Sequence, residues 1–122
     1  MLTSIVRALC NHLAQTGLPV YLADCVPSSA AFPYITAEPK APLAPHAPGQ
    51  LALTLWCAGD TAHTQRLAQA DLLLKQLPAR GLRLTTEDGV IVLRQEGGAA
   101  FLRESAAQGL KTVWSVRFYP DA

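Results

Sequence analysis

The chain has 122 residues, of which 50% are hydrophobic and 16% charged, and its formal net charge is +1 at pH 7. This length fits one domain that buries roughly two thirds of its unfolded surface. Lys and Arg form no block, which argues against electrostatic capture of nucleic acid. No apolar run approaches the roughly twenty residues that a membrane span requires. Polar residues interrupt the first apolar stretch, so we expect no signal peptide. The low charged fraction favours a protein that has partners.

The three cysteines, Cys10, Cys25 and Cys57, lie among apolar neighbours. An odd number of cysteines in apolar surroundings predicts reduced, buried thiols in a cytosolic protein. A zinc site is the alternative, because Asp60 and His63 follow Cys57 closely. That spacing matches no standard ligand pair, so we expect no metal.

The first predicted element is an amphipathic helix over residues 3–16. Thr3 or Ser4 can cap its first amides, and Gly17 supplies a left-handed stop. Its apolar stripe consists of Ile5, Val6, Leu9, Cys10 and Leu13.

Three strands are predicted next, over residues 19–26, 32–38 and 50–58. The first two are expected to form an antiparallel pair. Pro33 cannot donate to a ladder, so it should lie at a strand start or on an edge. Alternation in the third run predicts a strand with both faces at least partly covered.

A second helix is predicted over residues 59–81, with Pro78 and Gly81 ending it. Its expected core-facing stripe is His63, Leu67, Ala70, Leu74 and Leu77. In residues 82–95, Asp88-Gly89 lies between two β-prone runs and predicts a hairpin.

The last predicted strand covers residues 110–120. Side chains expected on one face are Leu110, Thr112, Trp114, Val116 and Phe118; those expected on the other are Lys111, Val113, Ser115, Arg117 and Tyr119. The whole order is helix, three strands, helix, three strands. It predicts one α+β domain over residues 1–122, with a mostly antiparallel sheet of about six strands packed on one side by two helices.

Two connections, residues 38–49 and 95–109, are long for a compact domain, and we expect both to be hairpin arms. The first places a proline at every third position, the repeat of polyproline II, in Pro39, Pro42, Pro45 and Pro48. A ligand for an aromatic groove or a spacer between domains would share this pattern. However, strands flank the segment on both sides, which favours an arm.

Catalytic patterns are weak throughout the sequence. No glycine-rich phosphate loop precedes a helix, and no carboxylates are paired at helical spacing. Glu87 and Asp88 are adjacent carboxylates, but they fall in a predicted turn, and turn formation is enough to explain why acidic residues occur there. We therefore expect no enzymatic activity and no cofactor.

Four stretches together resemble the tail terminator, or tail completion, proteins of long-tailed bacteriophages and prophages: "FPYITAE", "LWCAGDTAHTQRLAQADLLLKQL", "EDGVIVLRQ" and "TVWSVRFY". The resemblance spans about residues 3–119, and Pro33-Tyr34-Ile35 is its most specific motif. It implies a non-enzymatic protein that forms a ring, generally a hexamer, on the head-proximal end of the tail tube. Such a ring ends tube polymerisation and offers a surface for head joining.

The implied partners are further copies of the chain, the tail-tube protein and a head–tail connector or neck protein, with no membrane and no sequence-specific nucleic acid. The implied location is the host cytoplasm during assembly and then the virion tail. A head-completion or head–tail joining protein of the neck is one alternative. A small α+β module with a ligand between sheet and helices is another.

We expect the arms to contact neighbouring subunits or the tube. Ordering the proline segment costs ~1 kcal/mol or more per residue, and Leu43 is its only sizeable apolar anchor. In the second arm, an exposed Phe101-Leu102 pair is better explained by an interface than by solvent. The predicted interface residues are Pro33, Tyr34, Pro39, Lys40, Pro42, Leu43, Pro45, Pro48, Phe101, Leu102, Arg103 and Glu104.

Overall fold

The computed structural model describes residues 2–14, 17–41, 49–76, 81–104 and 106–120. The predicted α+β class and the order of two helices and six strands are confirmed. The elements are α1 (Leu2–Leu13), β1 (Val20–Leu22), β2 (Tyr34–Ala41), β3 (Gly49–Ala58), α2 (His63–Gln76), β4 (Leu82–Thr86), β5 (Gly89–Glu104) and β6 (Ala107–Pro120).

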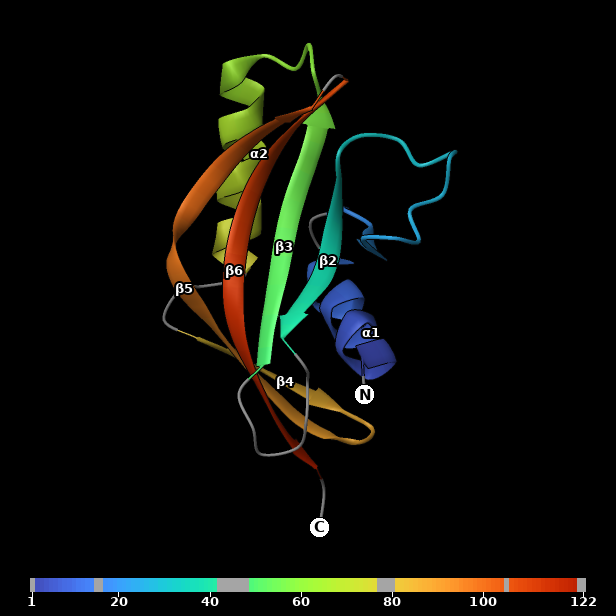
Figure 1. The fold of residues 1–122 in the computed structure, drawn as a ribbon, viewed down its shortest axis with the longest axis vertical. Helices are drawn as coiled ribbons and strands as arrows, with labels where there is room; N and C mark the ends of the chain where they lie inside the picture. The colour runs from blue at the N-terminus through green and yellow to red at the C-terminus, as the bar shows by residue number, and fades with distance from the viewer. Residues whose placement is uncertain (1, 15–16, 42–48, 77–80, 105, 121–122) are drawn as a thin grey trace.

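The six strands form one sheet in the order β1-β2-β3-β6-β5-β4. This sheet curls into a half-barrel, so that α1 contacts both edge strands, β1 and β4. The second helix, α2, lies on the same side of the sheet and contacts α1 (Figure 1). Both helices therefore pack on the concave face, and no helix of the described residues covers the convex face.

The core lies between the two helices and the concave face. Leu9 and Leu13 of α1 are fully buried there, in one cluster with side chains from every strand. The alternation predicted for β6 is confirmed, because Trp114, Val116 and Phe118 are buried in this core. Their neighbours along β6 point to the convex face.

The predicted antiparallel pairing of the first two strands is wrong. β1 pairs with β2 in parallel, with Val20 opposite Ile35 and Leu22 opposite Ala37. Residues 23–33 form turns and cross back, so that β2 begins beside the start of β1. A connection of about this length suffices for a parallel crossover, whereas a tight hairpin would have forced the antiparallel arrangement.

The predicted hairpin at residues 95–109 is present, but its sides are the paired ends of β5 and β6, so the long loop expected there is wrong. β5 continues to Glu104, and β6 begins at Ala107 and pairs with both β5 and β3. The register of β5 shifts between Glu96 and Ala100, and Gly97 has a φ of 66°. Gly97 therefore belongs to a bulge inside a strand, where a left-handed residue is tolerated.

The predicted core-facing stripe of α2 is also wrong in its phase. His63 and Leu67 are exposed, while Leu73 is fully buried and Ala70 is half-buried. Three consecutive leucines, residues 72–74, leave the buried side of the helix undecided in the sequence. In the structure, the buried side passes through Arg66, Ala70 and Leu73, which is the i, i+4, i+7 pattern.

Part of the prediction for α2 falls outside what the structure describes. The helix is described as far as Gln76, so Leu77 and the predicted stop at Pro78 lie outside the described residues. The same holds for the side chain of Leu74.

The hairpin expected around Asp88-Gly89 is confirmed, displaced by one residue. Thr86 pairs with Gly89, so Glu87 and Asp88 form the loop. The Thr86 hydroxyl accepts hydrogen bonds from the backbone N–H groups of Asp88 (3.2 Å) and Gly89 (3.1 Å). The Thr86 side chain therefore satisfies two backbone N–H groups of the turn.

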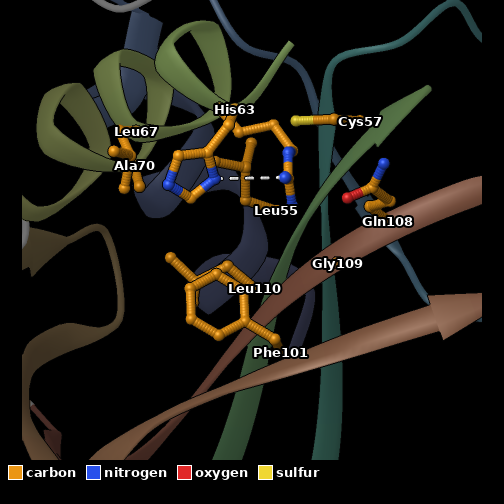
Figure 2. Close-up of a pocket in the computed structure, with 10 residues that line it drawn as sticks. Leu55, Cys57, His63, Leu67, Ala70, Phe101, Gln108, Gly109 and Leu110 are labelled. Carbon is orange, nitrogen blue, oxygen red and sulfur yellow. Dashed lines mark hydrogen bonds between the residues drawn. The ribbon is translucent and has the colours of Figure 1, made fainter. Parts of the chain in front are cut away.

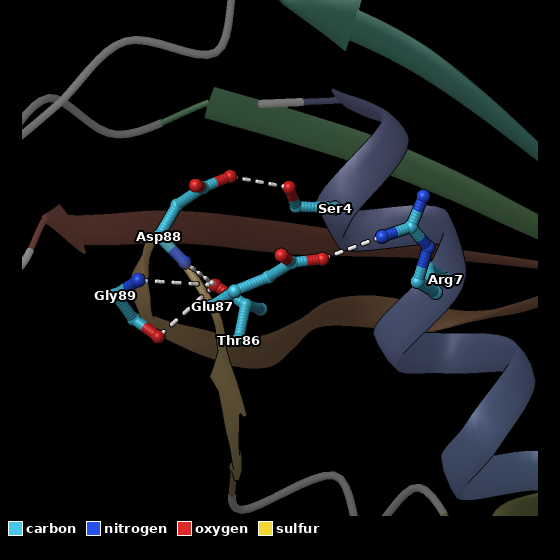
Figure 3. A network of polar contacts seen from close by, with 6 residues as sticks. All are labelled: Ser4, Arg7, Thr86, Glu87, Asp88 and Gly89. Carbon is cyan, nitrogen blue, oxygen red and sulfur yellow. Dashed lines mark hydrogen bonds and ion pairs between the residues drawn. The ribbon is translucent and has the colours of Figure 1, made fainter.

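Two polar contacts hold this turn against α1 (Figure 3). Ser4 donates its hydroxyl to the Asp88 carboxylate at 2.5 Å, and the Arg7 guanidinium pairs with Glu87 at 2.5 Å. Because both partners of the ion pair are largely exposed, it stabilises the fold only weakly. The contacts join the first turns of α1 to the loop between β4 and β5.

Candidate interaction surfaces

The described residues contain no group of three His, Cys, Asp or Glu side chains that could hold a metal ion. Cys57 donates its thiol hydrogen to Gln69 Oε1 at 2.9 Å, and His63 Nδ1 lies 3.2 Å from a guanidinium nitrogen of Arg66. Burial raises the pKa of the Cys57 thiol, and the nearby Arg66 charge lowers it by less. Cys57 and His63 therefore each contact a different side chain of α2, Gln69 and Arg66 respectively.

The prediction of three buried thiols is wrong at Cys25. Cys57 is buried and Cys10 half-buried, but Cys25 is exposed in the turn that follows β1. Its thiol donates to an Asp24 carboxylate oxygen at 3.5 Å. That hydrogen bond, together with the carboxylate charge, raises the pKa of Cys25.

The predicted residues Pro33 and Tyr34 belong to an aromatic cluster at the start of β2. Pro33 directly precedes the strand, as expected, and both residues are half-buried. The Tyr34 ring stacks on Phe32, with centroids 5.3 Å apart, and meets the edge of Tyr21 at 5.8 Å. Trp56 of β3 lies opposite Tyr34. Tyr34 therefore lies within an aromatic cluster on the convex face, and Phe32 is an exposed member of that cluster.

The described part of the proline segment is the end of β2. Pro39 and Lys40 are exposed there, and Lys40 pairs with Glu38 at 3.1 Å. The predicted interface residues Pro42, Leu43, Pro45 and Pro48 lie outside the described residues.

Phe101 and Leu102 do not form one exposed apolar pair, because successive residues of β5 point to opposite faces. Phe101 lies opposite Leu110 on the concave side and is 71% exposed. Leu102 lies opposite Gly109 on the convex side and is half-buried. Trp56 also packs over Gly109, where a Cβ would come within 3.0 Å of the indole ring.

We call the group of side chains around the far end of β5 the Phe101 edge: Phe101, Arg103, Glu104, Arg66 and Leu67. Leu67 of α2 is 45% exposed, and Figure 2 shows it above Phe101 across a narrow gap. Arg66 and Leu67 line this gap together with Phe101. Its volume is about 40 Å³, enough for one or a few water molecules and far below a typical ligand pocket. Within the described chain, β5 beyond Leu93 pairs only with β6, so this edge of the sheet is open.

A second surface, which the sequence analysis missed, lies at the opposite lateral edge of the sheet. It is an open hollow of about 520 Å³ where β1 and β2 end. We call it the Asp24 hollow, and its main lining residues are Leu22, Asp24, Cys25, Ala37, Glu38 and Pro39. No sequence signal marks it, because its two walls come from strands that the crossover brings together.

The described residues that flank the proline segment lie at the opposite end of the sheet from the β5–β6 tip. Ala58 pairs with Ala107 at the β5–β6 tip, whereas Gly49, which follows the proline segment, pairs with Val116. β3 spans the distance between them with ten residues, or roughly 30 Å. The described interface residues Pro39 and Lys40 therefore do not form one continuous surface with those of the β5–β6 tip.

Comparison with known proteins supports the fold and no more. No protein-family model matches the chain, and no curated protein is significantly similar to it. One solved structure, which bears no functional name, superposes with a TM-score of 0.58 at 18% sequence identity. The match covers 98% of this chain and 94% of that chain. At this identity the likeness concerns the arrangement of elements over the full length.

Within the described residues, neither α1 nor α2 has the length and apolar character of a membrane-spanning helix.

Proposed function

We propose that this chain is a structural tail protein of a phage or prophage that forms a ring on the head-proximal end of the tail tube. The ring ends tube polymerisation and presents a surface for head joining. The observation that carries the proposal is a single sheet whose two lateral edges differ within the described residues, one bearing an exposed phenyl ring and the other a hollow. A subunit with different surfaces on its two sides suits a head-to-tail ring.

The ligand-binding alternative receives less support. It requires room between the sheet and the helices, and the gap between α2 and the sheet has a volume of only about 40 Å³. Small-molecule pockets are typically about 300–1,000 Å³ and enclose most of their ligand. The Asp24 hollow is large enough, but it is open and lies at the rim of the sheet.

The neck-protein alternative shares small size and multimeric assembly with the terminator, so binding partners must separate them. The test uses the tail-tube protein encoded by the same genome, assembled into tubes in the presence and absence of this chain. We expect shorter tubes with a ring at one end in electron micrographs. Tubes of unchanged length with no bound density, alongside binding to the head connector, would instead favour the neck protein. A genome with no tail-tube gene would contradict the proposal.

A further inference from the structure

We propose that the end of β5, residues 100–104, pairs with the same segment of a second copy of this chain. The two segments form an antiparallel strand pair about a two-fold axis at Leu102, which joins the two sheets into one. The inference goes beyond the proposed function, because it concerns copies that are free of any tail tube. A two-fold contact uses one surface on both partners and stops at two copies.

Backbone groups at this end of β5 point outward from the sheet. Gly59 donates its N–H to the Ala106 carbonyl at 3.0 Å, which continues the β3–β6 ladder. The backbone groups of every second residue from Ala106 onward, including those of Leu110, therefore face β3. Leu110 lies opposite Phe101, so the N–H and C=O groups of Phe101 face away from β6. Those of Arg103, two residues further along, face the same way.

In the part of the chain that the structure describes, no strand covers this side of β5 beyond Leu93. Pairing with β4 ends there, and β6 lies on the other side (Figure 1). Residues 96–101 and 103–104 are exposed, and the Phe101 ring keeps 71% of its surface in water. A strand edge with outward donors and acceptors beside apolar side chains is a template for another strand. The end of β5 is therefore suited to a strand partner.

The other edges of the described sheet are less suited to pairing. In β1, the carbonyl of Val20 accepts the thiol hydrogen of Cys10 at 3.4 Å. The carbonyl of Leu22 accepts the backbone N–H of Cys25 at 3.0 Å. β2 extends beyond β1, but Pro39 in that extension has no N–H to donate, and β4 lies against α1. The best strand partner that a second copy offers is therefore its own end of β5.

The register follows from the length of the regular segment. β5 shifts register before Ala100 and ends at Glu104, so its regular end is five residues long. Centring the two copies on Leu102 pairs all five. Phe101 then exchanges backbone hydrogen bonds with Arg103 of the second copy. A centre one residue earlier would extend the pairing into the bulge, and a centre one residue later would oppose two guanidinium groups.

The paired side chains complement one another. A two-fold axis perpendicular to the sheet keeps the concave faces of both copies on one side, where each Phe101 ring lies beside an Arg103 guanidinium. On the convex side the two Leu102 side chains meet, and each Glu104 lies opposite Ala100 instead of another acid. Aromatic and arginine side chains are the types most often found at the centres of interfaces.

Disulfide trapping tests the register. In a chain whose three cysteines are replaced by alanine, Leu102→Cys places two thiols on opposed residues of a non-hydrogen-bonded pair. Their Cα atoms are then about 4.5 Å apart, which suits a disulfide. We expect a covalent dimer under mild oxidation with diamide. Ala100→Cys and Glu104→Cys are the matched controls: each should stay uncrosslinked alone, and the two should crosslink when mixed.

A proline substitution tests the outward backbone groups. Phe101→Pro removes the N–H that faces the second copy, whereas the bonds between β5 and β6 belong to Ala100 and Leu102 and remain. Phe101→Ala removes the same ring and keeps the N–H. The dimer dissociation constant of Phe101→Pro should exceed that of Phe101→Ala by about tenfold, because each copy loses one donor. Light scattering over a concentration series without tail tubes measures both constants, and circular dichroism checks the fold.

The outcomes bear on the two proposals separately. The two-fold pairing is wrong if the native chain stays monomeric at every concentration without tubes, or if Leu102→Cys crosslinks no faster than the control variants alone. Equal dissociation constants for the two Phe101 variants would also contradict it. A ring on tube ends can form in each of these cases, so the proposed function would stand. A trapped Leu102→Cys dimer from a native chain that never associates with tubes would support the pairing and contradict the ring.

Discussion

Trp114 donates its indole N–H to the hydroxyl of Thr112, two residues earlier on β6, at 2.8 Å. Thr112 in turn donates to the backbone carbonyl of Leu53 on β3 at 3.2 Å. Both side chains are almost completely buried. This short chain of hydrogen bonds satisfies the one polar group of the largest core side chain and ties β6 to β3.

Thr112→Val removes the hydroxyl while nearly preserving the side-chain volume. The Trp114 N–H then remains buried without an acceptor, so the free energy of unfolding should fall by ~1–3 kcal/mol. Urea denaturation measures the change. Thr54→Val is the matched control, because Thr54 is also buried, on the convex face, and accepts no hydrogen bond from Trp114. Equal losses for the two variants would show that the Thr112 bridge contributes nothing specific.

Trp114→Ala removes the largest fully buried side chain of the core. The resulting cavity should cost ~3–5 kcal/mol in the free energy of unfolding, as for other buried aromatics. Phe101→Ala provides the contrast, because an exposed aromatic should cost less than ~1 kcal/mol. A loss under ~1 kcal/mol for Trp114→Ala in urea melts would contradict the assignment of this face to the core.

Gly89→Ala tests the close approach at the start of β5. Gly89 has a φ of 154°, and an added Cβ would collide with the Tyr119 carbonyl oxygen and lie 2.8 Å from Pro120 Cα. Since backbone would have to move, we expect a loss of ~1–3 kcal/mol or more in thermal and urea melts. Gly98→Ala has open space around it and should change stability little. A native-like melting curve for Gly89→Ala would show that the β5–β6 pairing relaxes easily at this end.

Asp24→Asn should make Cys25 more reactive. The carboxylate accepts a hydrogen bond from the neutral thiol and repels the thiolate, and both effects raise the pKa of Cys25 above its ordinary value of 9.0. Removing the charge lowers this pKa, and below the pKa each unit of lowering gives about tenfold more thiolate. Alkylation by iodoacetamide near pH 8 should therefore accelerate in dilute protein whose Cys10 and Cys57 are replaced. Glu38→Gln is the control, and an unchanged rate for Asp24→Asn would contradict the Asp24 contact.

Replacing residues 42–48 by a Gly-Ser linker of equal length tests the proline segment. We expect monomer melting to stay nearly unchanged and ring formation or tail completion to weaken, because prolines lower the ordering cost that a partner must offset. Unfolding of the variant would make the segment part of the core. Unimpaired assembly and tail completion would reduce it to a connection between β2 and β3.

The sequence alone determined the features that depend on local spacing. Alternation along β6 assigned Trp114 and Phe118 to the core, because the period of a strand is two wherever it lies. Helical spacing likewise placed Leu9 and Leu13 of α1 inside, and turn residues marked the β4–β5 hairpin. These local preferences also gave the order of elements, and with it the α+β class.

Only the tertiary structure decided what depends on contacts between distant residues. The parallel pairing of β1, the strand character of residues 95–104 and the buried side of α2 each follow from neighbours that arrive from elsewhere in the chain. The same holds for the level shared by Phe101 and Val20, which lie on strands at opposite sides of the sheet. Register across a sheet is set by the sum of all its strand pairings, and no local pattern in one strand contains that sum.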